Sequence, residues 1–202
     1  YGSIRDLVQA LRVVLPDGRP LYVGRPVMKN VAGYDLVKLF VGAQGSLGLI
    51  TDVTLKLAAR PRKTQTLSVS VPSWLQGLEW AAVLSEAALV ASAILVGRMS
   101  SASDGLSLVY TAEGLPQDVE AELTSVRTLL RRAGAPDPVV SSRDGSSLWA
   151  DWLAVDFAGP QELLVRAGVA PKDVTETARA VLPHLGNACM LVDAPNGHLT
   201  LR

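Results

Sequence analysis

The sequence predicts an α+β fold in two domains, one made of residues 1–61 and the other of residues 62–202. The run Arg60-Pro61-Arg62 interrupts the pattern and marks the boundary between them. Beyond it, strand-like and helix-like segments follow in the order β-α-β, β-α and β-α-β-β. That order favours an antiparallel sheet with the helices on one face.

The first domain is expected to be mainly strand. Residues 10–24 read as a hairpin, because an Asp-Gly pair separates two apolar runs. Residues 35–41 predict a short helix with Asp35 as its N-cap. Residues 47–57 alternate between apolar and polar side chains, which is typical of a half-buried strand.

The second domain carries longer elements. Strands are expected at 64–71, 93–98, 106–111, 162–169, 188–193 and 198–202, and helices at 73–90, 117–132, 145–154 and 172–183. In the second of these helices, one apolar stripe contains Val119, Leu123, Val126 and Leu130. A Pro-Asn-Gly turn joins the last two strands into a hairpin.

Composition excludes several classes of function. Of 202 residues, 49% are hydrophobic and 19 basic residues balance 19 acidic ones, so a strongly basic face for nucleic acid is not indicated. Cys189 is alone, which rules out an internal disulfide, and we expect it to be buried and inert. The two histidines and this cysteine lack metal-ligand spacing. Residues 80–97 are apolar but contain Glu86, which favours a buried helix running into a strand over a membrane span.

A glycine series is the main chemical signal. Gly42, Gly45 and Gly48 stand three residues apart between the expected helix and the following strand, with Ser46 among them. Glycine permits positive φ and close backbone approach, and exposed N–H groups in such a loop hold a phosphate or a purine edge. The alternative is a tight connection with packed glycines. Neither GxxxxGK[ST] nor GxGxxG is present, which disfavours phosphate-loop and Rossmann enzymes.

The run KNVAGYDLVKLFVGAQGSLGLITDVTLKLAARP resembles the end of the FAD-binding domain in the FAD-linked oxidase family of the vanillyl-alcohol oxidase type. The opening run YGSIRDLVQALRVVLPDGR is similar to the segment just upstream in that family. The form KNVAGYDL is shared with the FAD-binding subunits of bacterial glycolate oxidase. The resemblance spans residues 1–61 and implies the C-terminal part of the FAD-binding domain, followed by a substrate-side cap domain.

The resemblance also implies FAD as the cofactor. Its adenosine diphosphate half is expected along the backbone of a set of residues that comprises Tyr1, Gly2, Ser3, Gly42, Gly45, Ser46, Gly48 and Ile50. Ala43 and Gln44 depart from the family pattern, so no side-chain role is carried over to them. The chain begins at Tyr1, without the glycine-rich pyrophosphate loop that precedes this region in the family. We therefore expect a fragment that binds FAD weakly or not at all by itself.

The implied activity is oxidation of a 2-hydroxy acid to a 2-oxo acid by the FAD-binding subunit of a glycolate-oxidase-like complex. Its partners would be a second flavin subunit and an iron–sulfur subunit, in the cytoplasm or at the membrane periphery through those partners. Two alternatives stay open. One is a stand-alone FAD-dependent dehydrogenase of the same family with another substrate. The other is a non-catalytic fragment whose cap domain is an interaction surface.

Some side chains have two interpretations, either a contact with cofactor or substrate or an ordinary structural role: Lys29, Tyr34, Trp149 and Trp152. A hydroxy-acid dehydrogenase needs a base for the hydroxyl proton, and histidine is the usual choice. His184 and His198 are the candidates, but no motif supports either, so the catalytic base stays unassigned.

Overall fold

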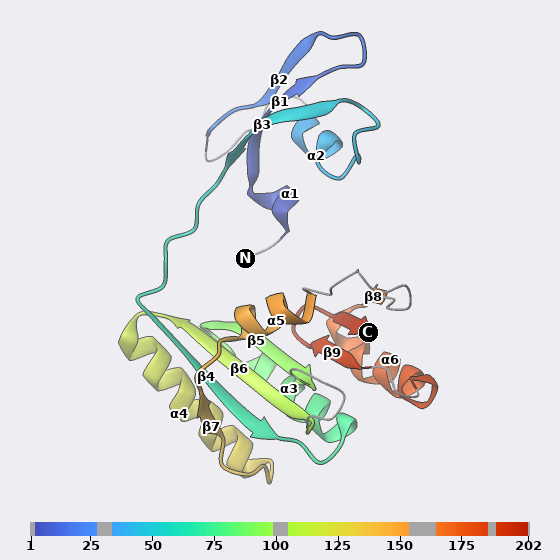
Figure 1. Ribbon diagram of the computed structural model, residues 1–202. Helices are drawn as coiled ribbons and strands as arrows, with labels where there is room; N and C mark the ends of the chain where they lie inside the picture. The colour runs from blue at the N-terminus through green and yellow to red at the C-terminus, as the bar shows by residue number, and fades with distance from the viewer. Residues whose placement is uncertain (1–2, 28–33, 99–104, 154–164, 186–188, 202) are drawn as a thin grey trace. The chain divides into compact units, whose positions relative to one another are not determined.

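The computed structural model describes residues 3–27, 34–98, 105–153, 165–185 and 189–201 (Figure 1). The chain divides into two compact units, unit 1 from Tyr1 to Arg60 and unit 2 from Pro61 to Arg202. Both combine helices with antiparallel sheet, which confirms the predicted α+β class.

Unit 1 is a small sheet with two short helices. In chain order its elements are α1 (Ile4–Leu7), β1 (Val8–Val14), β2 (Pro20–Gly24), α2 (Leu36–Phe40) and β3 (Leu49–Leu55). The strand order is β2-β1-β3, and both pairs are antiparallel. The predicted hairpin and helix are confirmed, and Asp35 caps α2 by accepting a hydrogen bond from the Lys38 N–H at 3.3 Å. Helix α1 was not predicted.

The core of unit 1 is small and leaves β3 uncovered. Its buried side chains are Leu11, Val13, Val23, Val37 and Phe40. Every residue of β3 is exposed, including Leu49 at 68% and Leu55 at 49%, so the strand forms as predicted but its expected half-burial is wrong. The reason is that α2 packs on β1 and β2, and no described element of unit 1 covers either face of β3.

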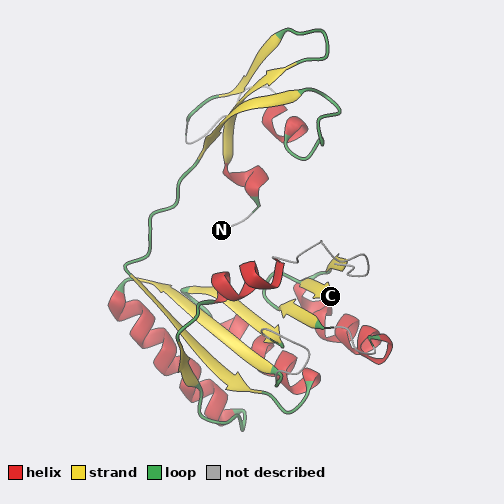
Figure 2. Cartoon of the chain, viewed as in Figure 1, coloured by secondary structure: helices red, strands yellow, loops and turns green. Residues whose placement is uncertain are grey.

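Unit 2 is built on a seven-stranded antiparallel sheet (Figure 2). The strands are β4 (Lys63–Ser70), β5 (Ala91–Gly97), β6 (Ser107–Gly114), β7 (Val139–Ser141), β8 (Val165–Gly168), β9 (Met190–Asp193) and β10 (His198–Leu201). The helices are α3 (Trp74–Ala87), α4 (Pro116–Arg132), α5 (Gly145–Leu153) and α6 (Val174–Val181), with short 3₁₀ turns at Pro171–Asp173 and Leu182–His184. The sheet order is β7-β4-β6-β5-β9-β10-β8.

The helices do not all lie on one face of this sheet, which corrects the prediction. Helices α3, α4 and α6 pack with side chains such as Ile94, Leu108 and Tyr110 in the main core. Helix α5 lies on the opposite face, where Leu148 packs with Leu95, Val109 and Leu191 (Figure 2).

Buried hydrogen bonds explain how α5 docks there. The N–H of Gly145 donates to Oγ1 of Thr111 at 2.8 Å, and Thr111 also contacts the hydroxyl of Thr66 at 2.9 Å. A Cβ at position 145 would overlap the Cβ of Ala93, so glycine allows the helix to start directly on the strands.

A buried carboxylate joins α4 to the sheet. Glu122 is 7% exposed and accepts hydrogen bonds from the Tyr110 hydroxyl at 2.5 Å and from the N–H groups of Leu89 and Val90 at 3.0 and 3.1 Å. Its charge is therefore compensated by three donors, as a buried carboxylate requires. Burial, together with the hydrogen bond to Glu122 and its negative charge, raises the pKa of Tyr110 well above the usual tyrosine value.

Glu122→Gln should destabilise unit 2 by about 1–3 kcal/mol, because an amide group then faces three donors with one acceptor fewer. Denaturant unfolding of the 202-residue chain measures the loss. The matched control is Glu120→Gln on the exposed side of α4, where Glu120 pairs with Lys63, and its midpoint should barely move. Equal effects of the two substitutions would contradict the role of Glu122.

Tyr110 should make stability fall at alkaline pH. Because its pKa is raised on folding, the unfolded chain releases this phenol proton first as the pH rises. The stabilisation that the folded state gains from the raised pKa of Tyr110 is complete below the ordinary tyrosine pKa of about 10 and is lost as the pH rises above it. The free energy of unfolding of wild type should thus fall more steeply above about pH 10 than that of Tyr110→Phe. Tyr34→Phe, at a side chain that is 95% exposed, should follow wild type; parallel curves for all three proteins would refute the shift.

Candidate functional site

The loop between α2 and β3 has a left-handed backbone at several positions. The φ angles are +88° at Gly42, +52° at Gln44 and +77° at Gly45. Gln44 is the one non-glycine residue with positive φ in the described part of the chain. The loop is closed by Ser46, whose N–H and hydroxyl both donate to the carbonyl of Ala43, at 3.0 and 2.6 Å. The Ser46 hydroxyl proton is therefore used within the loop.

The glycines of this loop differ in what surrounds them. A Cβ at Gly45 would meet no atom within 4 Å, and within the described residues the N–H groups of Gln44 and Gly45 have no hydrogen-bond acceptor. At Gly48, a Cβ would lie 2.7 Å from the Val13 side chain and 2.9 Å from the Val14 carbonyl. Gly45 thus leaves room for a ligand, whereas Gly48 serves packing. Ile50 pairs with Val13 across β3 and β1.

The N-terminal candidates are only partly visible. Tyr1 and Gly2 lie outside the described residues. Ser3 begins α1, and its N–H and hydroxyl donate to the Asp6 carboxylate at 3.1 and 2.6 Å, which lowers the pKa of Asp6. From the same helix, Arg5 donates to the Val41 carbonyl at 3.0 Å. This bond holds α1 beside the start of the glycine loop.

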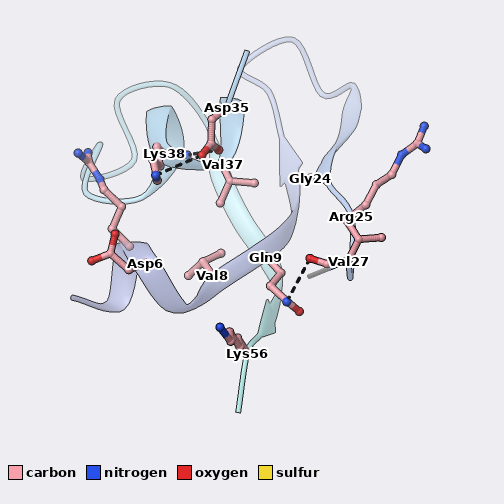
Figure 3. A pocket seen from close by; sticks show the side chains of 11 residues that line it. Asp6, Val8, Gln9, Gly24, Arg25, Val27, Asp35, Val37, Lys38 and Lys56 are labelled. Atoms are coloured by element: carbon pink, nitrogen blue, oxygen red, sulfur yellow. Dashed lines mark hydrogen bonds and ion pairs between the residues drawn. The ribbon is translucent and has the colours of Figure 1, made fainter. Parts of the chain in front are cut away.

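A polar cavity of about 260 Å³ lies next to this contact (Figure 3). Its lining includes four basic residues, Arg5, Arg25, Lys38 and Lys56, and two acidic ones, Asp6 and Asp35. Lys38 pairs with Asp35 at 3.5 Å, whereas Arg25 and Lys56 make no ion pair with any described residue. Figure 3 shows the Arg25 side chain extending away from the other labelled groups. The surplus positive charge suits a small anionic group.

No local sequence pattern indicates this cavity, because its lining comes from α1, β1, β2, α2 and the residue that follows β3. Lys29, the lysine that the sequence offers as a cofactor contact, lies outside the described residues. Tyr34 is 95% exposed, so of its two interpretations the structural one, packing of the ring, does not hold for the described part of unit 1. The side chains of Trp149 and Trp152 in α5 also lie outside the described part.

The two candidate bases lie in unit 2. His184 is exposed at the end of a 3₁₀ turn. His198 is exposed at the start of β10, directly across from Asp193 on β9. Burial raises the pKa of Asp193, against the opposing effects of a 2.9 Å hydrogen bond from Asn196 and of the nearby His198. His198 is therefore the histidine with a carboxylate neighbour.

Cys189 is half-buried, not fully buried as expected, because it lies one residue before β9, where the chain joins the sheet. Its thiol is free. Among the described residues, no three His, Cys, Asp or Glu side chains are grouped as metal ligands. In the same residues, no helix has the length and apolar character needed to cross a membrane.

Comparison with known proteins gives relatives for part of the chain. No family model matches. The glycolate oxidase subunit GlcE of Escherichia coli is 47% identical over 66 residues, which is 33% of this chain and 19% of that protein. The subunit GlcD of Bacillus subtilis is 46% identical over 67 residues, or 33% and 14% of the two chains. D-2-hydroxyglutarate dehydrogenase of Stutzerimonas stutzeri is 35% identical over 74 residues, which is 37% of this chain and 16% of that protein.

Solved structures resemble the whole chain. Alkyldihydroxyacetonephosphate synthase has a TM-score of 0.70 at 16% identity, covering 100% of this chain and 46% of that one. p-Cresol methylhydroxylase has a TM-score of 0.68 at 14% identity, covering 97% and 51%. A VAO-type flavoprotein from Myceliophthora thermophila has a TM-score of 0.56 at 18% identity, covering 98% and 42%. At such identities the likeness shows the fold, and this chain spans about half of these structures.

Proposed function

We propose that this chain belongs to the FAD-linked flavoproteins of the vanillyl-alcohol oxidase type and is part of an oxidoreductase that converts a 2-hydroxy acid to a 2-oxo acid. One observation carries the proposal. Sequence likeness to a glycolate oxidase subunit covers 33% of the chain, while likeness in fold to flavoproteins covers nearly all of it. The two likenesses are of different kinds and indicate the same family.

We assign the two units separate tasks. Residues 1–61 act as the C-terminal part of an FAD-binding domain, and residues 62–202 act as the substrate-side cap. The glycine loop, the Ser3 cap and the basic cavity all lie in unit 1 and support the first assignment. The large sheet of unit 2 supports the second, since substrate sites need a rigid scaffold.

The residues of unit 1 suit the adenosine diphosphate half of FAD. When bound, FAD supplies the acceptor for the hydride from the substrate. The N–H groups of Gln44 and Gly45 are free to donate to its oxygens, and the Arg5 guanidinium, which lies beside Gly42, adds positive charge at the start of the loop. The wider set inferred from the family resemblance also includes Tyr1, Gly2, Ser3, Gly42, Ser46 and Ile50. Gly48 shapes the loop by packing against Val13 and Val14 of β1.

The finer proposal is an FAD-binding subunit of a glycolate-oxidase-like complex, with a second flavin subunit and an iron–sulfur subunit as partners. The names of the relatives GlcE and GlcD support it. The alternative, a stand-alone dehydrogenase with another substrate, has support from relatives named D-lactate dehydrogenase and D-2-hydroxyglutarate dehydrogenase. The exposed apolar side chains of β3 also favour a covering partner or segment.

Gly45→Ala should weaken FAD binding about three- to tenfold in the complete polypeptide that carries this sequence, because a methyl group would obstruct the two free N–H groups. A flavin fluorescence titration measures the change. Gly134→Ala is the control, since Gly134 has a φ of +76° and an equally open surrounding but lies in unit 2. If both variants bind FAD as tightly as wild type, the loop does not contact the cofactor.

The substrate assignment has a test of its own. The same polypeptide, loaded with FAD, should reduce an artificial electron acceptor when glycolate or D-lactate is added, and acetate should give no reduction. Activity without partner subunits would favour the stand-alone dehydrogenase. Activity that appears only after the partner subunits are added would favour the complex. Reduction with neither acid under both conditions would exclude these two substrates.

A further inference from the structure

Four polar side chains share one face of the sheet at β9, β10 and β8. Asp193 lies across from His198, and Thr200 lies across from Arg166, in the antiparallel registers of these strands. His198 and Thr200 are two residues apart on β10 and therefore point to the same side. A Cβ on Gly168 would lie 3.8 Å from the His198 Nδ1, which places the imidazole over β8. We call these four residues the polar quartet.

The polar quartet faces away from α3, α4 and α6. Leu199, between His198 and Thr200, packs in the main core on the side of those helices. Leu191, which pairs with Thr200, packs instead against Leu148 of α5. The quartet thus continues the face that α5 covers, at the edge of the apolar cluster formed by Leu95, Val109, Leu148 and Leu191.

Two buried oxygen atoms of the polar quartet have no hydrogen-bond partner. Three buried side-chain polar atoms of the described residues are unpartnered, and two of them are Oδ1 of Asp193 and Oγ1 of Thr200. Thr200 is only 1% exposed. Native proteins rarely leave such groups unpaired, since each loses its bonds to water without replacement. Their coincidence on one face indicates a missing hydrogen-bonding group.

The charges around these oxygens indicate what that group is. Arg166 is exposed and makes no ion pair with any described residue, and a guanidinium pairs best with a carboxylate, through two parallel hydrogen bonds. From strand spacing, the quartet spans roughly 10 Å by 7 Å, which suits an acid of a few carbon atoms. A hydroxyl on that acid would both donate and accept, as the oxygens of Asp193 and Thr200 require.

We propose that the polar quartet binds a small carboxylate that also carries a hydroxyl group. Arg166 pairs with the carboxylate, while Thr200 and Asp193 hold the hydroxyl beside His198. The binding itself depends only on unit 2. That the bound acid is the substrate to be oxidised rests on the proposed function, and in that case His198 is placed to accept the hydroxyl proton.

Calorimetric titration of the 202-residue chain with glycolate, without added FAD, tests the proposal. Wild type should bind glycolate saturably and bind acetate, which lacks the hydroxyl, more weakly. Thr200→Val should weaken glycolate binding about three- to tenfold, and Arg166→Met should abolish measurable binding. Thr200→Ser, which keeps the hydroxyl, should retain wild-type affinity.

Two control variants match these changes elsewhere in unit 2. Thr64→Val alters an exposed threonine of β4, and Arg179→Met alters an exposed arginine of α6; both should bind like wild type. Absence of saturable glycolate binding to wild type would overturn the proposal. So would quartet variants that bind as tightly as the controls. Because FAD is absent, either failure leaves the FAD titration of Gly45→Ala to be judged separately.

Discussion

The two-residue period of the strands in unit 2 is the constraint on which the rest of that unit depends. Successive side chains on β5 and β9 must point to opposite faces. One set, with Ile94 and Met190, forms the core under α3, α4 and α6. The other set, with Leu95 and Leu191, receives α5. Along β10, the same alternation places Thr200 and His198 on the face of the sheet that α5 covers. The helical core and the polar quartet therefore both follow from this alternation of side chains.

Polar groups fix how the layers meet that sheet. On the helical side, Glu122 accepts from Tyr110 and from two backbone N–H groups, which ties α4 to β6 and to the residues that follow α3. On the other side, Thr111 receives the first N–H of α5. Each polar atom in these two arrangements is paired, whereas Thr200 and Asp193 retain unpaired oxygens. This contrast separates structural polar groups from those proposed to bind a ligand.

The sequence predicted best where the signal was local. The stripe through Val119, Leu123, Val126 and Leu130 is buried as its helical spacing indicated, and both hairpins form at their turn residues. It failed where the outcome depends on distant neighbours. Alternation in β3 predicted a buried face, but nothing described in unit 1 covers that face. The side on which α5 packs depends on a fit between Gly145 and Ala93 that no pattern encodes. The basic cavity and the polar quartet likewise draw residues from separate segments.

Cofactor binding is the central claim, and the visible spectrum of the purified complete polypeptide that carries this sequence tests it most directly. The released small molecule should be identified by mass spectrometry after denaturation. We predict flavin absorption bands and release of FAD in about one equivalent, as expected of a single site. A colourless protein that retains no FAD after incubation with an excess would contradict the account.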